Sequence, residues 1–310
     1  MNTMNTNDIE VVLTIPAIGR EQRIGSVLNH VCQVMYQMEN TNTESNRRIV
    51  WDFGKCSFLH PYLLGALSVL KRMYGDVVVC RNIPANIVDY LNVIYFHEPL
   101  SVIDDCNNDD LWNRYHGKTY LPICEFNPKD KSSIKAQELV QSTVRNQLGG
   151  NMHSVLSYML SELIDNITDH SHSPRGYIFC QTIPRQNILY VFIADVGRSI
   201  YSSYASDPRY MEQLDNSESS ALLLALSGKS TKNRPESENR GYGISKTREL
   251  VVNGLGGEFF LLSGSAFARH DAGGEIIADL PGDLRWNGTI ALLKIPTVMP
   301  PQFNIYNYIS

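Results

Sequence analysis

The sequence has no excess of basic residues and no long apolar run. Its 27 lysines and arginines are outnumbered by 32 acidic residues, which gives a formal net charge of −5. Nucleic-acid binding depends on a basic footprint, so no nucleic acid is expected as the main partner. No stretch is apolar for the length that crosses a bilayer, and the polar residues 1–10 lack the pattern of a signal peptide. No membrane partner is expected either.

Cysteine pairs are also missing. The six cysteines are scattered without a CxxC spacing, so the sequence indicates neither a zinc site nor a disulfide framework. Reduced thiols are typical of a cytosol, and we therefore expect a cytoplasmic location. What is present is an ordinary globular composition: 310 residues, of which 43% are hydrophobic and 19% are charged. This length predicts about two domains, each with its own core.

The first hundred residues alternate between strand and helix patterns. The expected strands are residues 9–15, 48–53 and 76–80, and the expected helices are residues 25–39, 61–74 and 85–96. Alternation of this kind predicts an open α/β sheet with helices on it for residues 8–106. Residues 107–133 are rich in turn-formers and charges, which indicates a linker. One strand is expected in it near residues 119–126, where it would complete the sheet of either domain.

Part of this first domain resembles a known family. Residues 51–80 and 83–96 resemble the STAS domain of anti-sigma-factor antagonists, in which a strand ending in Asp leads to a helix with an early glycine, then to a strand and a last helix. The resemblance implies a protein partner for this domain. Where the family has a phosphorylatable serine, residues 59–62 read Leu-His-Pro-Tyr. His60 is either a phosphoacceptor or a residue that precedes a helix at Pro61, and the second interpretation is favoured.

The second part of the chain is organised around residues 162–170, ELIDNITDH. At helical period Glu162, Asn166 and His170 share one face, and another face carries an apolar stripe of Leu156, Met159, Leu160, Leu163 and Ile167. A carboxylate such as Glu162 can orient or deprotonate a water or hydroxyl, and the Asn166 oxygen can hold a hard cation such as Mg²⁺. Alone, the pattern also fits the solvated face of an ordinary amphipathic helix.

A predicted hairpin follows, with strands at residues 176–183 and 188–194. Its second strand ends at Asp195, and Gly197 comes two residues later. An Asp in this place can point its carboxylate into a cleft and accept a hydrogen bond from an exocyclic amine such as that of adenine. The glycine would let the backbone approach a flat ligand. Alone, Asp195 is more often a turn or cap residue.

Two glycines, Gly241 and Gly243, precede a predicted helix at residues 244–253. Backbone N–H groups and the positive end of a helix dipole can bind phosphate, although such glycines also occur at ordinary joints between a loop and a helix. The GKST segment at residues 228–231 is not a phosphate loop, because Leu223 stands where the first glycine of that motif belongs.

Taken in order, ELIDNITDH, DVGRSI, NRGYGISKTRELV, GGEFFLLSG and NGTIALLKIP resemble the ATP-binding domain of GHKL (Bergerat-fold) proteins, which include histidine kinases, gyrase and MutL proteins. The resemblance covers residues 134–297 and leaves residues 298–310 as a C-terminal tail. It implies a histidine kinase-like α/β sandwich with a mixed, largely antiparallel sheet, and it implies ATP and Mg²⁺ as cofactors.

Carried over by position, the resemblance assigns Glu162 as the catalytic acid or base and Asn166 as the Mg²⁺ ligand. Asp195 would accept from the adenine amine. The residues implied around the adenine ring are Gly197 and Thr289, the second through hydrogen bonds near Asp195. The residues implied over the phosphates, in a mobile lid and at its end, are Lys229, Arg240, Gly241 and Gly243. Ile200 and Ile244 are implied as further nucleotide-binding residues.

Three features depart from the family pattern. Ser199 stands where the family often has a second glycine, and it is expected to stiffen that turn. Asp169 stands where histidine kinases commonly have a basic residue, and its charge disfavours a nearby triphosphate unless it points away or helps to hold the metal. The predicted helix at residues 134–147 contains no phosphoacceptor histidine, so an ordinary histidine autokinase is not expected.

The sequence therefore favours a Mg²⁺-ATP-binding regulatory protein, a slow ATPase whose lid state controls how the STAS-like domain meets a partner. Two alternatives remain. One is an anti-sigma-factor-like protein serine kinase in a partner-switching pathway, and the other is a non-catalytic nucleotide-binding interaction module. A homodimer is left open.

Overall fold

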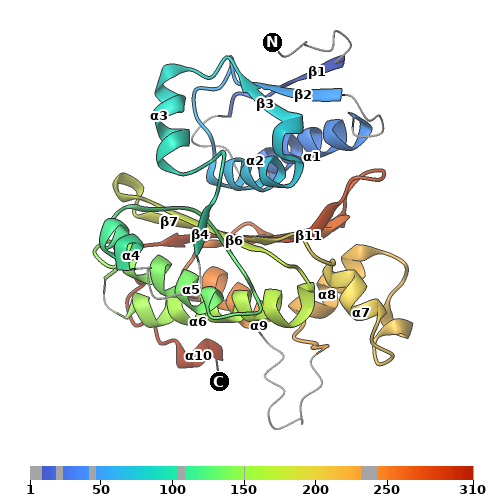
Figure 1. Cartoon of the computed structure of the whole chain (residues 1–310). Coiled ribbons are helices and arrows are strands. Elements are labelled where there is room, and N and C mark those ends of the chain that lie inside the picture. The colour runs from blue at the N-terminus through green and yellow to red at the C-terminus, as the bar shows by residue number, and fades with distance from the viewer. Residues whose placement is uncertain are drawn as a thin grey trace. The chain divides into compact units, whose positions relative to one another are not determined.

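The protein is mixed α/β and divides into two compact units, Met1–Pro99 and Leu100–Ser310. The structure, a computed structural model, describes residues 9–18, 24–41, 47–102, 109–149, 151–231 and 243–309. Each unit contains a β-sheet of its own (Figure 1). No helix in the described ranges is long and apolar enough to cross a membrane.

The first unit alternates strands and helices as the sequence predicts. Its elements are β1 (Ile9–Thr14), α1 (Ile24–Thr41), β2 (Arg47–Asp52), α2 (Pro61–Tyr74), the 3₁₀ turn η1 (Gly75–Val77), β3 (Val78–Arg81) and α3 (Ala85–Val93). The strands form a three-stranded parallel sheet in the order β1-β2-β3. Parallel neighbours need crossover connections, and α1 and α2 provide them.

Helix α2 begins where the sequence indicates. Pro61 occupies the first turn, where the missing N–H costs nothing, and residues 61–70 are all buried. His60 caps the helix, because its Nδ1 accepts a hydrogen bond from the Tyr62 N–H at 3.2 Å. The His60 side chain is only 2% exposed. A buried capping ring favours the helix-entry role over that of a phosphoacceptor.

The second unit is built on an eight-stranded sheet. Its elements are β4 (Leu100–Val102), α4 (Asp109–Tyr115), β5 (Tyr120–Phe126), α5 (Ser132–Thr143), α6 (Met152–Asn166), the π-helical turn η2 (Ile167–Ser171), β6 (Gly176–Ile183), η3 (Pro184–Gln186), β7 (Ile188–Asp195), α7 (Ile200–Ala205), η4 (Met211–Gln213), α8 (Glu218–Leu226), α9 (Gly243–Glu249), the π-helical turn η5 (Leu250–Gly254), β8 (Glu258–Gly264), β9 (Ala266–Asp271), β10 (Gly274–Asp279), β11 (Trp286–Pro296) and α10 (Tyr306–Ile309). The strand order is β10-β9-β8-β11-β7-β6-β5-β4. Only the β4–β5 pair among these is parallel, so the sheet is mixed and largely antiparallel.

Helix α6 is the element that carries the candidate site, and its apolar stripe holds it in place. Helices α5, α6 and α9 lie along one face of the sheet, with α6 packed against both of the others (Figure 1). The stripe residues are buried in one core with side chains of β6, β7 and β8; they are Leu156, Met159, Leu160, Leu163 and Ile167. The predicted packing face of this helix is therefore confirmed.

The strand expected in the linker belongs to the second unit. It is β5, which lies between β4 and β6 in the large sheet. Residues 107–133, interpreted from the sequence as a linker, also contain α4. The boundary between the two units lies between Pro99 and Leu100, whereas the sequence predicted it at residue 106. The boundary is earlier because β4 pairs with β5 and so belongs to the large sheet.

The C-terminal residues 298–310, expected as a tail, contain a short helix that packs on the second unit. Phe303 and Tyr308 stack with ring centroids 5.8 Å apart and contact the large core. A Cβ added at Gly254 would lie 3.0 Å from Phe303 Cε2, so a glycine lets this aromatic pair approach the end of η5.

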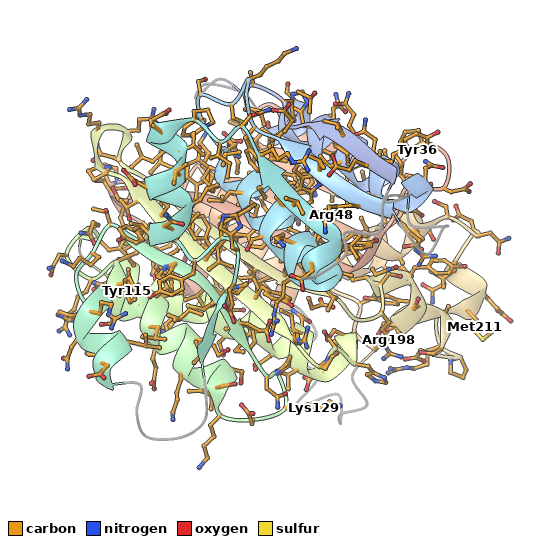
Figure 2. All side chains as sticks on the ribbon, turned by 45° about the horizontal axis from the view of Figure 1, so that its top comes forward. Tyr36, Arg48, Tyr115, Lys129, Arg198 and Met211 are labelled. Carbon is orange, nitrogen blue, oxygen red and sulfur yellow. The ribbon has the colours of Figure 1, made fainter. Side chains whose placement is uncertain are left out.

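A few large side chains remain exposed on each unit. Tyr36 on α1 is 59% exposed, and Met211 in η4 is 57% exposed (Figure 2). Single apolar side chains on a surface are normal in soluble proteins. These positions therefore carry no functional argument.

Candidate functional site

A cavity that is partly open to solvent lies in the second unit. Helix α6, the turn η2, the end of β7, helix α7, residues 229–231 and the start of α9 form its wall. Strands β7, β8 and β11 contribute the apolar side chains Ile193, Leu261 and Ala291. Small-molecule sites commonly combine apolar walls with a few polar groups that fix the orientation of the ligand. The lining of this cavity likewise combines apolar side chains with polar and charged groups.

Most of the site residues expected from the sequence line this one cavity. They are Glu162, Asn166, Asp195, Ile200, Lys229, Gly243, Ile244 and Thr289. Arg240 and Gly241 lie outside the described residues. Gly197 does not belong to the wall: a Cβ at this position would lie 2.0 Å from the Ser171 carbonyl oxygen. The glycine is needed there for close contact with η2, and it does not face the cavity as a ring-side residue would.

Glu162, Asn166 and Gly243 form one corner of the cavity, where α6 meets α9. The Asn166 side chain donates through Nδ2 to the Glu162 carbonyl oxygen at 2.6 Å. Because this bond uses the amide nitrogen, the amide oxygen is the atom of Asn166 that is able to hold a cation. A Cβ at position 243 would lie 2.4 Å from Glu162 Oε2, so only glycine allows the carboxylate its present place.

The side chains at this corner are too few to hold Mg²⁺ by themselves, so a nucleotide would have to supply the remaining ligands. No group of three or more His, Cys, Asp or Glu side chains in the described ranges is placed to hold a metal ion. Mg²⁺ in nucleotide sites commonly has one or two protein oxygens together with phosphate oxygens and waters. Asn166 meets that need as a single oxygen ligand.

Asp195 ends β7 and is the deepest acidic group of the cavity, with only 1% of its surface exposed. Its Oδ1 accepts from the Gly197 N–H at 2.8 Å, and the Thr289 backbone N–H also donates to the carboxylate. Burial raises the pKa of Asp195 to about 7, and these two hydrogen bonds oppose the rise. The carboxyl group is therefore poised between its neutral and charged forms near neutral pH.

The backbone of Asp195 is held by β11 and the residues next to it. Trp286 Nε1 donates to the Asp195 carbonyl oxygen at 3.0 Å. Gly288 has φ of 106°, and a Cβ there would lie 2.4 Å from the same oxygen. The β11–β8 pairing shifts register between Trp286 and Thr289, which brings Gly288 against Asp195. A glycine is required here both by its backbone angle and by the close approach.

Ser263, a residue that sequence reasoning missed, joins three sides of the site. Its hydroxyl accepts from the Ile200 N–H at 2.9 Å, donates to the Gly288 carbonyl at 3.1 Å and lies 2.9 Å from Thr289 Oγ1. The side chain is 1% exposed. Nothing in the sequence marks a serine near the end of a strand as such a connector, because its partners are distant in the chain.

The face of α6 that lines the cavity continues through a change of helix type. The α-helix ends at Asn166, and Ile167–Ser171 form the π-helical turn η2, followed by His172 with φ of 52°. His170 nevertheless lines the cavity together with Glu162 and Asn166. The sequence predicted this shared face at regular helical period, without the π-helical turn. Such turns are common at functional sites.

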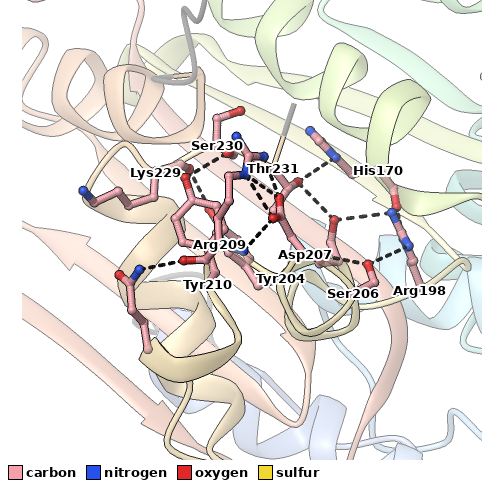
Figure 3. A network of polar contacts seen from close by, with 12 residues as sticks. His170, Arg198, Tyr204, Ser206, Asp207, Arg209, Tyr210, Lys229, Ser230 and Thr231 are labelled. Atoms are coloured by element: carbon pink, nitrogen blue, oxygen red, sulfur yellow. Dashed lines mark hydrogen bonds and ion pairs between the residues drawn. The ribbon is translucent and has the colours of Figure 1, made fainter. Parts of the chain in front are cut away.

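Lys229 and Ser230 are held by two tyrosines, one in α7 and one just before η4. The Tyr204 hydroxyl donates to the Lys229 carbonyl at 2.6 Å, and the Tyr210 hydroxyl donates to the Ser230 carbonyl at 2.9 Å (Figure 3). Their rings meet edge to face with centroids 5.2 Å apart. Burial raises the pKa of Tyr204, so its hydroxyl stays protonated and able to donate.

Comparison with known proteins adds no assignment. No protein-family model matches the chain, and no curated protein matches it. The function must therefore be inferred from the cavity and from the motifs that line it.

Proposed function

We propose that the second unit binds Mg²⁺-ATP in the manner of GHKL proteins and hydrolyses it slowly. In this proposal the state of the nucleotide controls how the first, STAS-like unit meets a protein partner. The observation that carries the proposal is the convergence of Glu162, Asn166, Asp195 and Gly243 on one cavity. These residues belong to three separate motifs, and the family resemblance needs all three motifs to meet.

Recognition of the base is assigned to Asp195. Its ionised carboxylate would accept a hydrogen bond from the exocyclic amine of adenine inside the cavity. A hydrogen bond to a buried charged group is stronger than one in water, and guanine would present an oxygen acceptor to the same group. Ile200 and Ile244 line the cavity and supply apolar surface for a flat ring.

The hydrolytic step is assigned to Glu162. Its carboxylate would orient a water and take the water's proton as the oxygen attacks the γ-phosphorus. The new P–O bond forms as the bond from the γ-phosphorus to the bridging oxygen breaks, and ADP leaves. Asn166 would hold the metal ion, which supplies neutralisation of the phosphate charge. Lys229 lines the cavity as a further cation.

Calorimetric titration of the full chain with ATP in the presence of Mg²⁺, followed by an assay of phosphate release, tests the proposal. We expect saturable binding and slow release of phosphate in the wild type. Asp195→Asn should weaken binding, and Glu162→Gln should lower turnover by about a hundredfold or more with binding retained. Glu212→Gln is the matched control, because Glu212 is exposed and does not line the cavity. Absence of binding heat in the wild type would refute the proposal.

A protein serine kinase would use the same site with a serine hydroxyl in place of water. The STAS-like order of elements in the first unit favours keeping this second candidate, since partner-switching pathways pair such domains with serine kinases. Incubation with γ-labelled ATP of the chain together with its co-purifying proteins distinguishes the kinase from the ATPase. Label on a co-purified protein indicates the kinase, whereas free phosphate alone indicates the ATPase.

A further inference from the structure

Arg198 lies in the cavity wall with a guanidinium group that is only partly engaged. Its backbone N–H donates to the Ser171 carbonyl at 2.7 Å, and its Nε donates to the His170 carbonyl at 2.6 Å. Among the residues that the structure describes, the two terminal nitrogens contact only hydroxyl groups, Nη1 with Ser206 and Nη2 with Ser203, each at 3.5 Å. Hydrogen bonds of that length are weak. The guanidinium group is therefore fixed at Nε, and its two outer nitrogens remain able to donate stronger hydrogen bonds to a ligand.

The surroundings of this cation contain hydroxyl and imidazole groups. Ser203 Oγ lies 3.3 Å from Thr231 Oγ1. Thr231 Oγ1 in turn lies 3.1 Å from His170 Nδ1 (Figure 3). Together with the two bonds of Arg198 to His170 and Ser203, these contacts close a ring of four residues that line the cavity. We name Arg198, Ser203, Thr231 and His170 the Arg198 wall. It joins η2, the first turn of α7 and residues 229–231.

The chemistry of the Arg198 wall suits an anion. Arg198 forms no ion pair with any carboxylate in the part of the chain that the structure describes. A guanidinium group binds phosphate with two parallel hydrogen bonds, and its fork geometry matches phosphate oxygens. Serine and threonine hydroxyls donate to the same oxygens. A neutral ligand would leave the outer nitrogens of Arg198 with only their weak contacts.

We propose that Arg198 is a specificity-determining residue that binds a phosphate group of the nucleotide, so that the cavity selects nucleoside diphosphates and triphosphates over nucleosides. This inference rests on the proposed function and deepens it. It assigns the selection of phosphorylated ligands over nucleosides to Arg198, which follows the proposed base-binding residue Asp195 by three positions. Neither the spacing of the motifs nor the position of Glu162 and Asn166 implies this role.

Calorimetry on the full chain with adenosine, ADP and ATP tests the inference. Arg198→Gln removes the charge, and Arg198→Lys keeps the charge but removes the fork. Arg198→Gln should weaken ADP and ATP binding by about tenfold to a hundredfold, because a hydrogen bond to a charged group contributes on that scale. Adenosine affinity should stay within about twofold of the wild type, since adenosine has no phosphate for Arg198 to contact. Ser206→Ala, beside Arg198 but exposed and outside the cavity wall, is the matched control and should change neither affinity.

The outcomes separate the inference from the function on which it rests. Equal losses for adenosine and ADP in Arg198→Gln would show a structural role for Arg198, and unchanged ADP affinity would show no role; either result overturns the inference while ATP binding stands. A wild type that binds neither ligand overturns both. If Arg198→Gln does not fold, the affinities of Arg198→Lys for adenosine and ADP are compared instead. The inference then predicts a smaller loss of ADP affinity with adenosine affinity unchanged, and equal losses for both ligands would overturn it.

Discussion

The raised pKa of Asp195 predicts that binding of adenosine strengthens as the pH rises from 6 to 8. The carboxyl group is 1% exposed, and burial raises its pKa to about 7 in the free protein. With this pKa, roughly one-tenth of the protein carries the carboxylate at pH 6 and roughly nine-tenths at pH 8. If only the carboxylate accepts from the adenine amine, the apparent affinity rises about tenfold over this range.

Adenosine is the ligand of choice for this measurement because it carries no phosphate that titrates in the same range. Isothermal titration at pH 6, 7 and 8 gives the affinities directly. Asp195→Asn is the control, since its carboxamide does not titrate, and its weaker binding should be independent of pH. Inosine, which has an oxygen in place of the amine, should not gain affinity at high pH. Equal affinities of the wild type at pH 6 and 8, or a pH dependence that survives in Asp195→Asn, would refute the assignment.

Three further predictions concern Glu162 and two glycines. Glu162→Gln should lower phosphate release by about a hundredfold to ten-thousandfold while ATP affinity is kept, and near-normal turnover would remove Glu162 from the mechanism. Gly243→Ala should lower turnover by about tenfold or more in a steady-state assay, because its Cβ would lie 2.4 Å from Glu162 Oε2; unchanged turnover would contradict the described corner. Gly288→Ala should destabilise the unit by about 1–3 kcal/mol in thermal unfolding, because φ is 106° and a Cβ would crowd the Asp195 carbonyl. Gly149→Ala, where a Cβ meets nothing within 4 Å, is its control, and equal losses for both would refute the reasoning.

Local patterns in the sequence predicted the elements well because each carries its own signal. Pro61 with the apolar residues after it marks α2, and the turn at Pro184–Gln186 between two β-rich runs marks the β6–β7 hairpin, which the register confirms. The apolar stripe of α6 likewise predicted which face is buried. These are properties of neighbouring residues, so one chain is enough to detect them.

Features that depend on distant residues could not be predicted in this way. The placement of β5 beside β6, and not in the sheet of the first unit, follows from hydrogen bonds between strands far apart in the chain. Ser263 reaches Ile200 and Gly288 across the site, and no local pattern marks it. Gly197 was expected beside a ligand ring, yet it packs on Ser171, because a glycine permits close approach to any neighbour. Arg198 stands inside a motif that the sequence singled out, but that it has no carboxylate partner among the described residues is visible only in three dimensions.

A crystal structure of the full chain with Mg²⁺ and a non-hydrolysable ATP analogue tests most directly whether the separate motifs serve one nucleotide. We expect the adenine amine at the Asp195 carboxylate, the metal ion on the Asn166 amide oxygen and a phosphate group on the Arg198 guanidinium. A nucleotide bound elsewhere, or bound here with its base away from Asp195 and its metal away from Asn166, would contradict the proposed function.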